Sequence, residues 1–183
     1  MKRAMIFRVA QFSMIIAGST VVCGMTGCQT TNSVLGPCYP GDSWARVQAW
    51  PVLDDFHDAA SKADGARYFA HFAPDAVFLG TDATERWTLD EFKKFAEPYF
   101  SQGRGWTYTL VPQTRFCKEA GDGVIMFDEL LENDKLGRCR GSGVLIRVGK
   151  EWKILQYNLT MTVPNEIAED VAKQSRAVIK EPQ

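Results

Sequence analysis

The sequence has few of the residues that metal sites and nucleic-acid interfaces need. It holds 2 histidines and 5 cysteines in 183 residues, without a CxxC pair or the Cys/His spacing of a zinc site. The formal net charge is -1, and no run of lysine and arginine with interleaved aromatics occurs, whereas nucleic-acid binding requires a basic face. We therefore expect no metal, no cofactor and no nucleic-acid partner.

A hydrophobic run long enough to span a bilayer is also missing. The apolar stretch from Phe12 to Val22 is shorter than the roughly 20 residues that a spanning helix needs. It follows Lys2 and Arg3, and Gly24 interrupts it where cleavage of a secretory signal is expected. These features predict a signal peptide over residues 1–27, with a membrane anchor or buried helix as the alternative.

The end of this segment, Met25-Thr26-Gly27-Cys28, resembles a bacterial lipobox, in which the cysteine thiol is lipidated and becomes the mature N-terminus. Several acyl chains, at about 0.8 kcal/mol per buried methylene, would anchor the protein stably. The alternative is plain cleavage, which leaves a soluble periplasmic protein. Gln29 favours the outer membrane, by resemblance to enterobacterial sorting rules. We expect an exported periplasmic protein anchored through Cys28, with the polar residues 28–42 as a tether.

Residues 43–163 are typical of one small α+β domain. Helical spacing predicts helices over 43–64 and 66–72, and the capping box Thr88/Glu91 starts a third over 89–100. An extended run follows the second helix at 76–79. Period-two alternation then predicts four strands, at 106–117, 123–132, 138–148 and 152–162. The expected fold is a cone-shaped, strongly curved antiparallel sheet with three N-terminal helices on its concave face, plus a C-terminal helix and tail in 164–183.

Several segments of this domain match a known family pattern. They are Tyr68-Phe69, Phe72 to Phe78, Gly80-Thr81-Asp82, Phe127-Asp128-Glu129, Arg140 to Leu145, Trp152-Lys153-Ile154 and Tyr157-Asn158. With them the chain resembles the SnoaL-like family, in the fold group of nuclear transport factor two and ketosteroid isomerase, over residues 50–163. The resemblance implies the fold but no reaction, because this fold hosts isomerases, cyclases, dehydratases and adaptors.

The resemblance also argues against one kind of enzyme. Ketosteroid isomerase needs a base at the end of the first strand and a donor tyrosine on the first helix. The matching positions are Gly80 and Phe56, so proton abstraction by that mechanism is lost. Glu129 as a general base, assisted by His57 or Arg140, is left as a hypothesis.

Loop lengths assign faces to the strands, because a slip of one residue inverts every side chain. With a four-residue loop at 134–137 and a three-residue loop at 149–151, one inner face results. It contains Tyr108, Leu110, Phe127, Glu129, Leu131, Arg140, Ser142, Val144, Ile146, Ile154 and Asn158. We expect Glu129 to pair with Arg140 or to meet water, since buried charges need partners.

The polar residues of this face define a candidate site. Together with two side chains from elsewhere, the candidate ligand pocket contains Tyr108, Glu129, Arg140, Ser142, Asn158, Trp87 and His57, and the candidate catalytic residues are Glu129 and His57. A structural ion pair and a polar ligand site are both compatible with this cluster. Core packing is the alternative for His57 and Trp87.

The same register places Leu145, Tyr157, Leu159 and Met161 on the outer face. We expect a homodimer, or the C-terminal segment 164–180, to cover them. It also places Cys117 and Cys139 outside and roughly 20 Å or more apart, too far for a disulfide, so Cys38 would supply one half of any bond.

Three functions remain open from sequence. The first is a domain that binds a small, partly apolar ligand without turnover. The second is an isomerase or hydrolase centred on Glu129. The third is a dimeric adaptor or structural protein whose cone is filled by its own side chains.

Overall fold

The computed structural model describes residues 43–179. The expected signal peptide and tether, with Cys28 and Cys38, lie outside the described residues. The helices are α1 (Ser43–Ser61), α2 (Gly65–Ala70), α3 (Leu89–Phe100) and α4 (Ala168–Val178), with a 3-10 turn at Asn165–Ile167. The strands are β1 (Phe72–Leu79), β2 (Arg86–Thr88), β3 (Thr109–Leu110), β4 (Phe116–Gly121), β5 (Val124–Asn133), β6 (Gly137–Val148) and β7 (Glu151–Met161).

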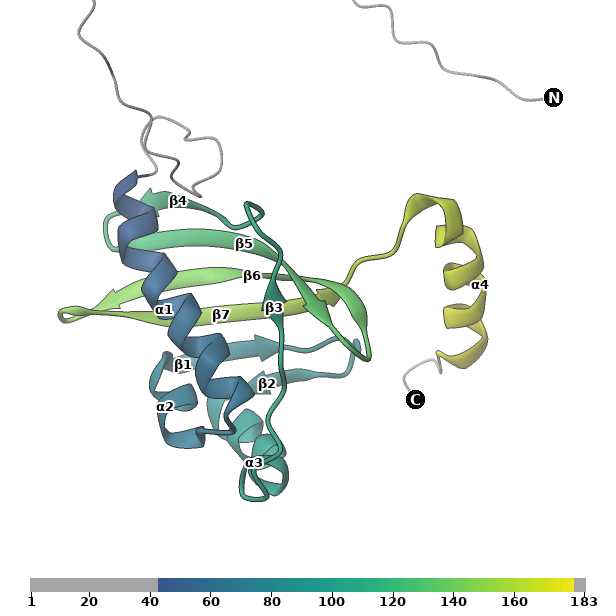
Figure 1. Ribbon diagram of the computed structural model, residues 1–183, viewed down its shortest axis with the longest axis horizontal. Helices are drawn as coiled ribbons and strands as arrows, with labels where there is room; N and C mark the ends of the chain where they lie inside the picture. Colours follow the sequence, from purple (N-terminus) through teal and green to yellow (C-terminus); the bar gives the residue numbers. More distant parts are fainter. Residues whose placement is uncertain (1–42, 180–183) are drawn as a thin grey trace, which may run out of the picture. The chain divides into compact units, whose positions relative to one another are not determined.

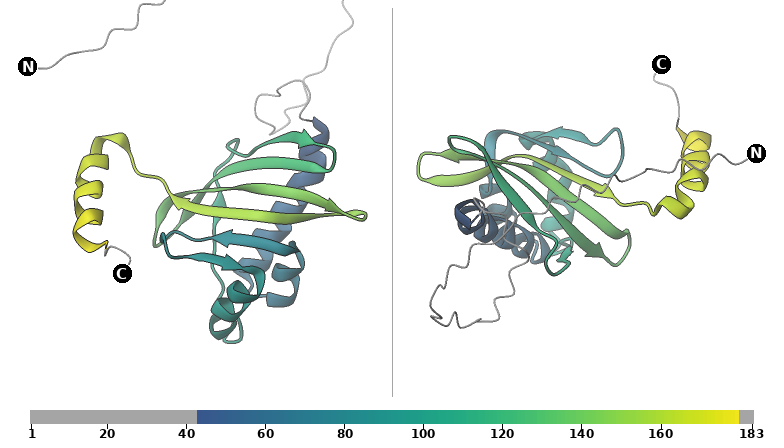
Figure 2. Two further views of the ribbon diagram at one scale, coloured as in Figure 1. Left: turned by 180° about the vertical axis from the view of Figure 1, so that it is seen from behind. Right: turned by 90° about the horizontal axis from the view of Figure 1, so that it is seen from above.

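The strands form one curved sheet in the order β2-β1-β7-β6-β5-β3, with β4 also paired to β5 (Figure 1). Helices α1, α2 and α3 lie against one face of it, as Figure 2 shows from two further sides. The α+β class is thus as expected, but the sheet is mixed. The first strand, β1, runs parallel to the last, β7. The connection between them contains α3 and the other strands, and so is long enough for a parallel pair.

Local sequence signals account for the helices. The side chain of Thr88 accepts the backbone N–H of Glu91, and Glu91 accepts that of Thr88, so the capping box starts α3 as predicted. Helix α1 continues through Pro51, which is exposed, and buries Leu53, Phe56 and Ala60. No residue of α4 is buried, and no helix among residues 43–179 is long and apolar enough to cross a bilayer.

The predicted strand over 106–117 is in fact two short strands, β3 and β4. Between them the hydroxyl of Thr114 donates to the carbonyl of Val111, and Gln113 has a positive φ of 63°. This turn changes the direction of the chain. The prediction of one continuous strand is wrong because it counted alternate residues across the turn.

The register of β5 and β6 also differs from the prediction by one residue. The loop between them has three residues, because Asn133 Oδ1 accepts the N–H groups of Lys135 and Leu136 and Gly137 adopts a φ of +67°. Glu129 therefore lies opposite Gly141, and Ser142 lies opposite Asp128. The predicted pairing of Ser142 with Asn158 is present, because a bulge after Val144 offsets a two-residue turn at 149–150.

This difference of one residue in register exchanges the predicted inner and outer side chains of β6 and β7. Arg140, Ser142, Val144 and Asn158 lie on the outer face, not the inner one. Leu145, Tyr157 and Leu159 are buried on the inner face, and only Met161 of that predicted outer set is exposed. Cys117 and Cys139 are also buried inside, opposite Phe127 and Leu131. These partners are four residues apart on β5, about 13 Å, so the two cysteines are too far apart to form a disulfide. They lie on the inner face, however, and not on the outer face as predicted.

Candidate functional site

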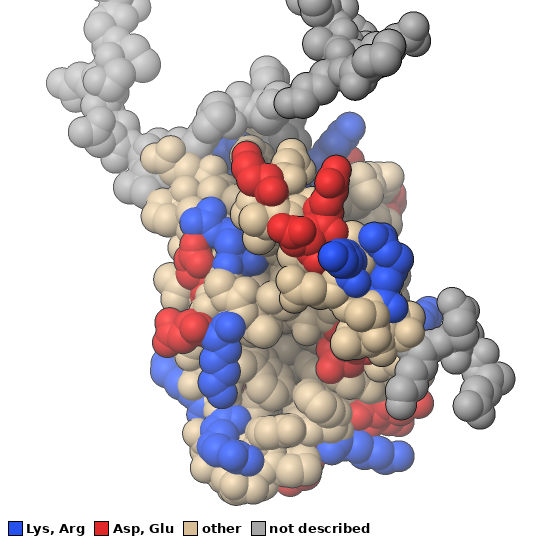
Figure 3. Space-filling view, turned by 90° about the vertical axis from the view of Figure 1, so that its right-hand side faces the viewer, with Lys and Arg blue, Asp and Glu red and all other residues tan. Residues whose placement is uncertain are grey.

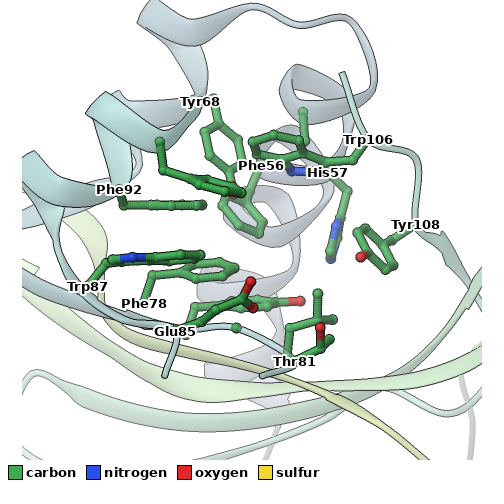
Figure 4. A pocket seen from close by; sticks show the side chains of 15 residues that line it. Phe56, His57, Tyr68, Phe78, Thr81, Glu85, Trp87, Phe92, Trp106 and Tyr108 are labelled. Atoms are coloured by element: carbon green, nitrogen blue, oxygen red, sulfur yellow. The ribbon is translucent and has the colours of Figure 1, made fainter. Parts of the chain in front are cut away.

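A cavity of about 220 Å³ opens between the three helices and the inner face of the sheet. Most of its lining side chains are aromatic, and Figure 4 shows them from close by. The lining residues are Phe56, His57, Ala60, Tyr68, Phe78, Gly80, Thr81, Glu85, Trp87, Phe92, Phe95, Trp106, Tyr108, Tyr157 and Leu159. A hollow with uncharged walls, bordered by charged side chains, is visible on the surface in Figure 3.

Several of these rings are parallel. Phe78 and Phe92 have centroids 4.0 Å apart at an interplanar angle of 18°, and Trp87 lies at 8° to Phe92. Phe78 is also within 10° of the plane of Tyr157. Parallel rings give the cavity flat walls, against which another flat ring gains stacking as well as burial.

Glu129 lies beneath this cavity and is fully buried. Its Oε1 lies 2.6 Å from Nε2 of His57 and accepts the hydroxyl of Tyr157 at 3.1 Å. Its Oε2 accepts Nε–H of Arg115 at 2.7 Å, and Arg115 also donates to Asp54 at 2.5 Å. The carboxylate is thus fully paired, as a buried charge must be, but its guanidinium partner is Arg115 and not the predicted Arg140.

These partners keep Glu129 ionised. Burial alone would raise the pKa of its carboxyl. The hydrogen bonds and positive charges of His57 and Arg115 outweigh that effect and hold the pKa below its usual range. Tyr157 donates to the same carboxylate, because burial, together with the neighbouring Glu129, raises the pKa of its hydroxyl well above the usual value.

His57 connects the buried carboxylate to the cavity. It comes from α1, lines the cavity, and its side chain is 12% exposed. Nε2 is directed at Glu129, whereas Nδ1 has no hydrogen-bond partner among residues 43–179. The predicted site residue Glu129 therefore does not line the cavity itself, whereas its partner His57 does.

A second carboxylate borders the cavity at the turn after β1. Gly80 donates its N–H to the carbonyl of Glu85 at 2.8 Å, and Asp82 donates its N–H to Glu85 Oε2 at 3.2 Å. A Cβ on Gly80 would lie 2.2 Å from Glu85 Oε2, so Glu85 occupies the space that a side chain at position 80 would need. Sequence reasoning missed Glu85, although a glycine that ends a strand signals such a close approach.

The seven predicted pocket residues are divided by the structure. Tyr108, Trp87 and His57 line the cavity, and Glu129 lies directly behind it. Arg140, Ser142 and Asn158 are on the opposite side of the sheet because of the one-residue slip. Clusters of His, Cys, Asp and Glu that could hold a metal ion do not occur among residues 43–179.

The family of the chain follows from a match to a known sequence pattern. The model of a SnoaL-like domain matches residues 51–164, which is more than half of the chain. The chain belongs to the SnoaL-like domain family. A search of the curated proteins gives no match to this sequence.

Solved structures of the same shape agree on the fold of this SnoaL-like domain. A protein with a cystatin-like fold from Caulobacter vibrioides superposes with a TM-score of 0.57 at 14% identity, covering 73% of this chain and 99% of the other. An NTF2-like protein of unknown function from Pseudomonas putida gives 0.56 at 13%, with 68% and 91% covered. A domain with a cystatin-like fold from Nostoc punctiforme gives 0.56 at 14%, with 79% and 90% covered. At these identities the similarity shows the fold alone.

Proposed function

We propose that this SnoaL-like domain binds a small, flat, uncharged molecule of one or two rings in the aromatic cavity. The observation that carries the proposal is the set of parallel rings around an open space of about 220 Å³. Such a cavity is smaller than the roughly 300–1,000 Å³ of drug-sized sites and shares their apolar lining with a few polar groups. Because this space is open, the alternative of a cone filled by the domain's own side chains fits the geometry less well.

The charges at the cavity select against an anionic ligand. No lysine or arginine is among its described lining residues, and Glu85 borders it with a carboxylate. The charge of Arg115 is already matched by Glu129 and Asp54. A carboxylate on the ligand would leave water without gaining a cation, which is costly, whereas a hydroxyl or carbonyl group has His57, Thr81 and Tyr108 as partners.

Binding of 2-naphthol and of 2-naphthoate, measured through the fluorescence of the cavity tryptophans Trp87 and Trp106, tests this proposal. We expect 2-naphthol to bind at least about tenfold more tightly, which corresponds to about 1.4 kcal/mol. The variant Thr81→Trp should block binding, because Thr81 lines the cavity and a tryptophan there would occupy part of its space. Thr160→Trp, exposed on the outer face of β7, is the matched control. Equal binding of both compounds, or binding unaffected by Thr81→Trp, would contradict the proposal.

We further propose that the domain acts outside the cytoplasm, at the periplasmic side of a membrane. The support is the sequence of residues 1–28 alone: a basic start, a short apolar stretch and the lipobox-like Met25 to Cys28. An aromatic site held at an outer membrane would meet small apolar molecules as they enter or leave the cell.

A homodimer is the remaining part of this proposal. The support comes from the outer face of the sheet, but from other side chains than those expected from sequence. Phe116 and Met126 point outward from neighbouring strands and are 38% and 49% exposed. A second copy placed against this face would remove both side chains from water, with a favourable contribution of roughly 25 cal/mol per Å² buried.

A further inference from the structure

Cys117 lies where helix α1 packs against strand β4. It is the second residue of β4, and its side chain is buried on the inner face. The guanidinium of Arg115, two residues earlier, donates to Asp54 of α1 at 2.5 Å. Because strand residues two apart are about 7 Å apart, this contact fixes the level of Cys117 along the helix.

Strand β4 runs toward the start of α1 (Figure 1). The turn after β4 contains Gly123, whose carbonyl accepts the N–H of Arg147 at 2.9 Å. Arg147 is paired with Trp152 of β7. The indole of Trp152 in turn donates to Gln48 at 3.0 Å and lies edge-on to the ring of Trp44, both in the first two turns of α1. The end of β4 is therefore at the N-terminal end of α1.

The chain before α1 is long enough to bring Cys38 to Cys117. Ser43, the first residue of α1, precedes Asp54 by eleven residues, or about 16 Å of helix. Ser43 is thus about 10 Å beyond the level of Cys117, and about 14 Å from it if the two packed layers are about 10 Å apart. Five residues separate Cys38 from Ser43 and span at most about 17 Å, and a disulfide adds about 6 Å between Cα atoms.

Cys139 is outside this reach. Its partner on β5, Leu131, lies four residues beyond Phe127, the partner of Cys117, in the direction away from the start of α1. The step adds about 13 Å along the strands and places Cys139 about 25 Å from Ser43. Burial also raises the pKa of the Cys139 thiol, which keeps it in the unreactive neutral form. Position therefore decides between the two partners that the sequence leaves open for Cys38.

We propose that Cys38 and Cys117 form a disulfide that fastens the chain before α1 to the inner face of the sheet beside β4. The inference rests on the proposed export, because structural disulfides persist in oxidising compartments. The oxidant is the disulfide of a thiol oxidase or of a small thiol compound. One cysteine thiolate attacks it to give a mixed disulfide, and the second thiolate then displaces the remaining oxidant thiol. The two cysteines lose two protons and two electrons, and the oxidant takes up both to become two thiols.

The bond closes a loop that contains α1, α2, β1 and α3. Such a bond stabilises a fold mainly by restricting the unfolded chain. It also restrains the helix on which the buried network depends, because α1 carries His57, the partner of Glu129, and Asp54, the partner of Arg115. Loss of the bond should therefore lower the thermal stability of the whole domain.

Peptide mapping of the full mature chain, extracted from cells with its thiols blocked, tests this bond. We expect the peptides of Cys38 and Cys117 to be joined and Cys139 to carry the alkylating label. Cys38→Ser should lower the melting temperature by about 5–10 °C. Dithiothreitol should lower that of the wild type equally and leave the variant unchanged. Cys139→Ala is the matched control, and it should keep both the joined peptides and the response to dithiothreitol.

A second arm separates this inference from the proposed export. Purified, fully reduced protein is treated with oxidised glutathione and mapped in the same way. Peptides joined in this arm but not in the extracted protein would contradict export and support the geometry. Cys38 joined to Cys139 or to Cys28, or joined to no other cysteine of the chain in either arm, would overturn the inference.

Discussion

At the scale of single residues, Glu129 is the centre of the buried hydrogen-bond network on the inner face. This fully buried carboxylate on β5 accepts hydrogen bonds from the segment just before β4 (Arg115) and from β7 (Tyr157), and it contacts α1 through His57. Removing one partner of such a buried pair is far more costly than losing a surface pair, because the remaining charge keeps its desolvation penalty. Stability and site geometry therefore depend on the same side chain.

This dependence predicts an effect of pH on stability. The folded-state pKa of Glu129 lies below its usual value of 4.5, so its contribution is fully present above about pH 4.5 and is lost as the pH falls through the lowered folded-state value. Glu129→Gln should lower the free energy of unfolding at pH 7 by about 3 kcal/mol and flatten its decline in acid, as measured by urea unfolding between pH 3 and pH 7.

Asp128→Asn is the control for this measurement. Asp128 precedes Glu129 on β5 and lies on the outer face, so its replacement should change the free energy of unfolding by no more than about 0.5 kcal/mol. An acid decline as steep in Glu129→Gln as in the wild type would show that other carboxylates govern acid unfolding.

At the scale of elements, Gly141 on β6 leaves room for the site because it has no side chain. A Cβ on Gly141 would lie 2.1 Å from the Tyr157 hydroxyl and 3.2 Å from Cγ of Glu129. Gly141→Ala should therefore displace Tyr157, lower the free energy of unfolding by about 1–3 kcal/mol, and weaken 2-naphthol binding. Gly121→Ala on β4, where nothing lies within 4 Å, should do neither. Equal urea midpoints for the two variants would be inconsistent with this packing.

Sequence patterns predicted most elements, and the pairing of Ser142 with Asn158, but not the register of β5 with β6. The helices were found because caps and apolar spacing are local, as the capping box of Thr88 and Glu91 illustrates. The register failed because Asn133 closes a three-residue loop before Gly137, and a four-residue loop uses the same residue types. The loop that Asn133 closes therefore turns Arg140 away from Glu129, and the arginine that contacts Glu129 is Arg115.

The candidate site was predictable in part, and the residues that failed are those of β6 and β7 that depend on the register of β5 with β6. His57, Trp87 and Tyr108 were identified and line the cavity. Arg115 was missed because it follows an unrecognised turn, and Glu85 because its position depends on how the 80–85 turn closes. Both are brought to the site by contacts between distant segments, which spacing along one strand does not encode.

At the scale of the whole molecule, the outer face of the sheet predicts self-association. Met126→Asp should convert a dimer to a monomer in sedimentation velocity, because it places a charge among outward side chains on β5. Met161→Asp is the matched control: Met161 is 44% exposed but pairs with Cys139 on the other side of the sheet. A monomeric wild-type protein, or equal effects of the two substitutions, would exclude this interface.

Anchoring to a membrane is tested on the intact chain. Cells fed an alkyne-tagged fatty acid should label the wild-type protein and place it in the outer-membrane fraction. Cys28→Ser should abolish labelling, because the lipidated thiol is lost, while Cys38→Ser should leave it unchanged. Labelled Cys28→Ser protein would contradict lipidation at this position.

The parallel pairing of β1 with β7 has a consequence for how the chain matures. Helices α1 and α2 and strand β1 are synthesised first, yet β1 lies beside a strand that begins only at Glu151. Until that last strand arrives, Phe78 and its aromatic neighbours have no sheet to cover them, and contacts so distant in sequence form slowly. A chain that ends before β7 should therefore stay unfolded and associate through these rings. The aromatic cavity is therefore among the last parts of the protein to form.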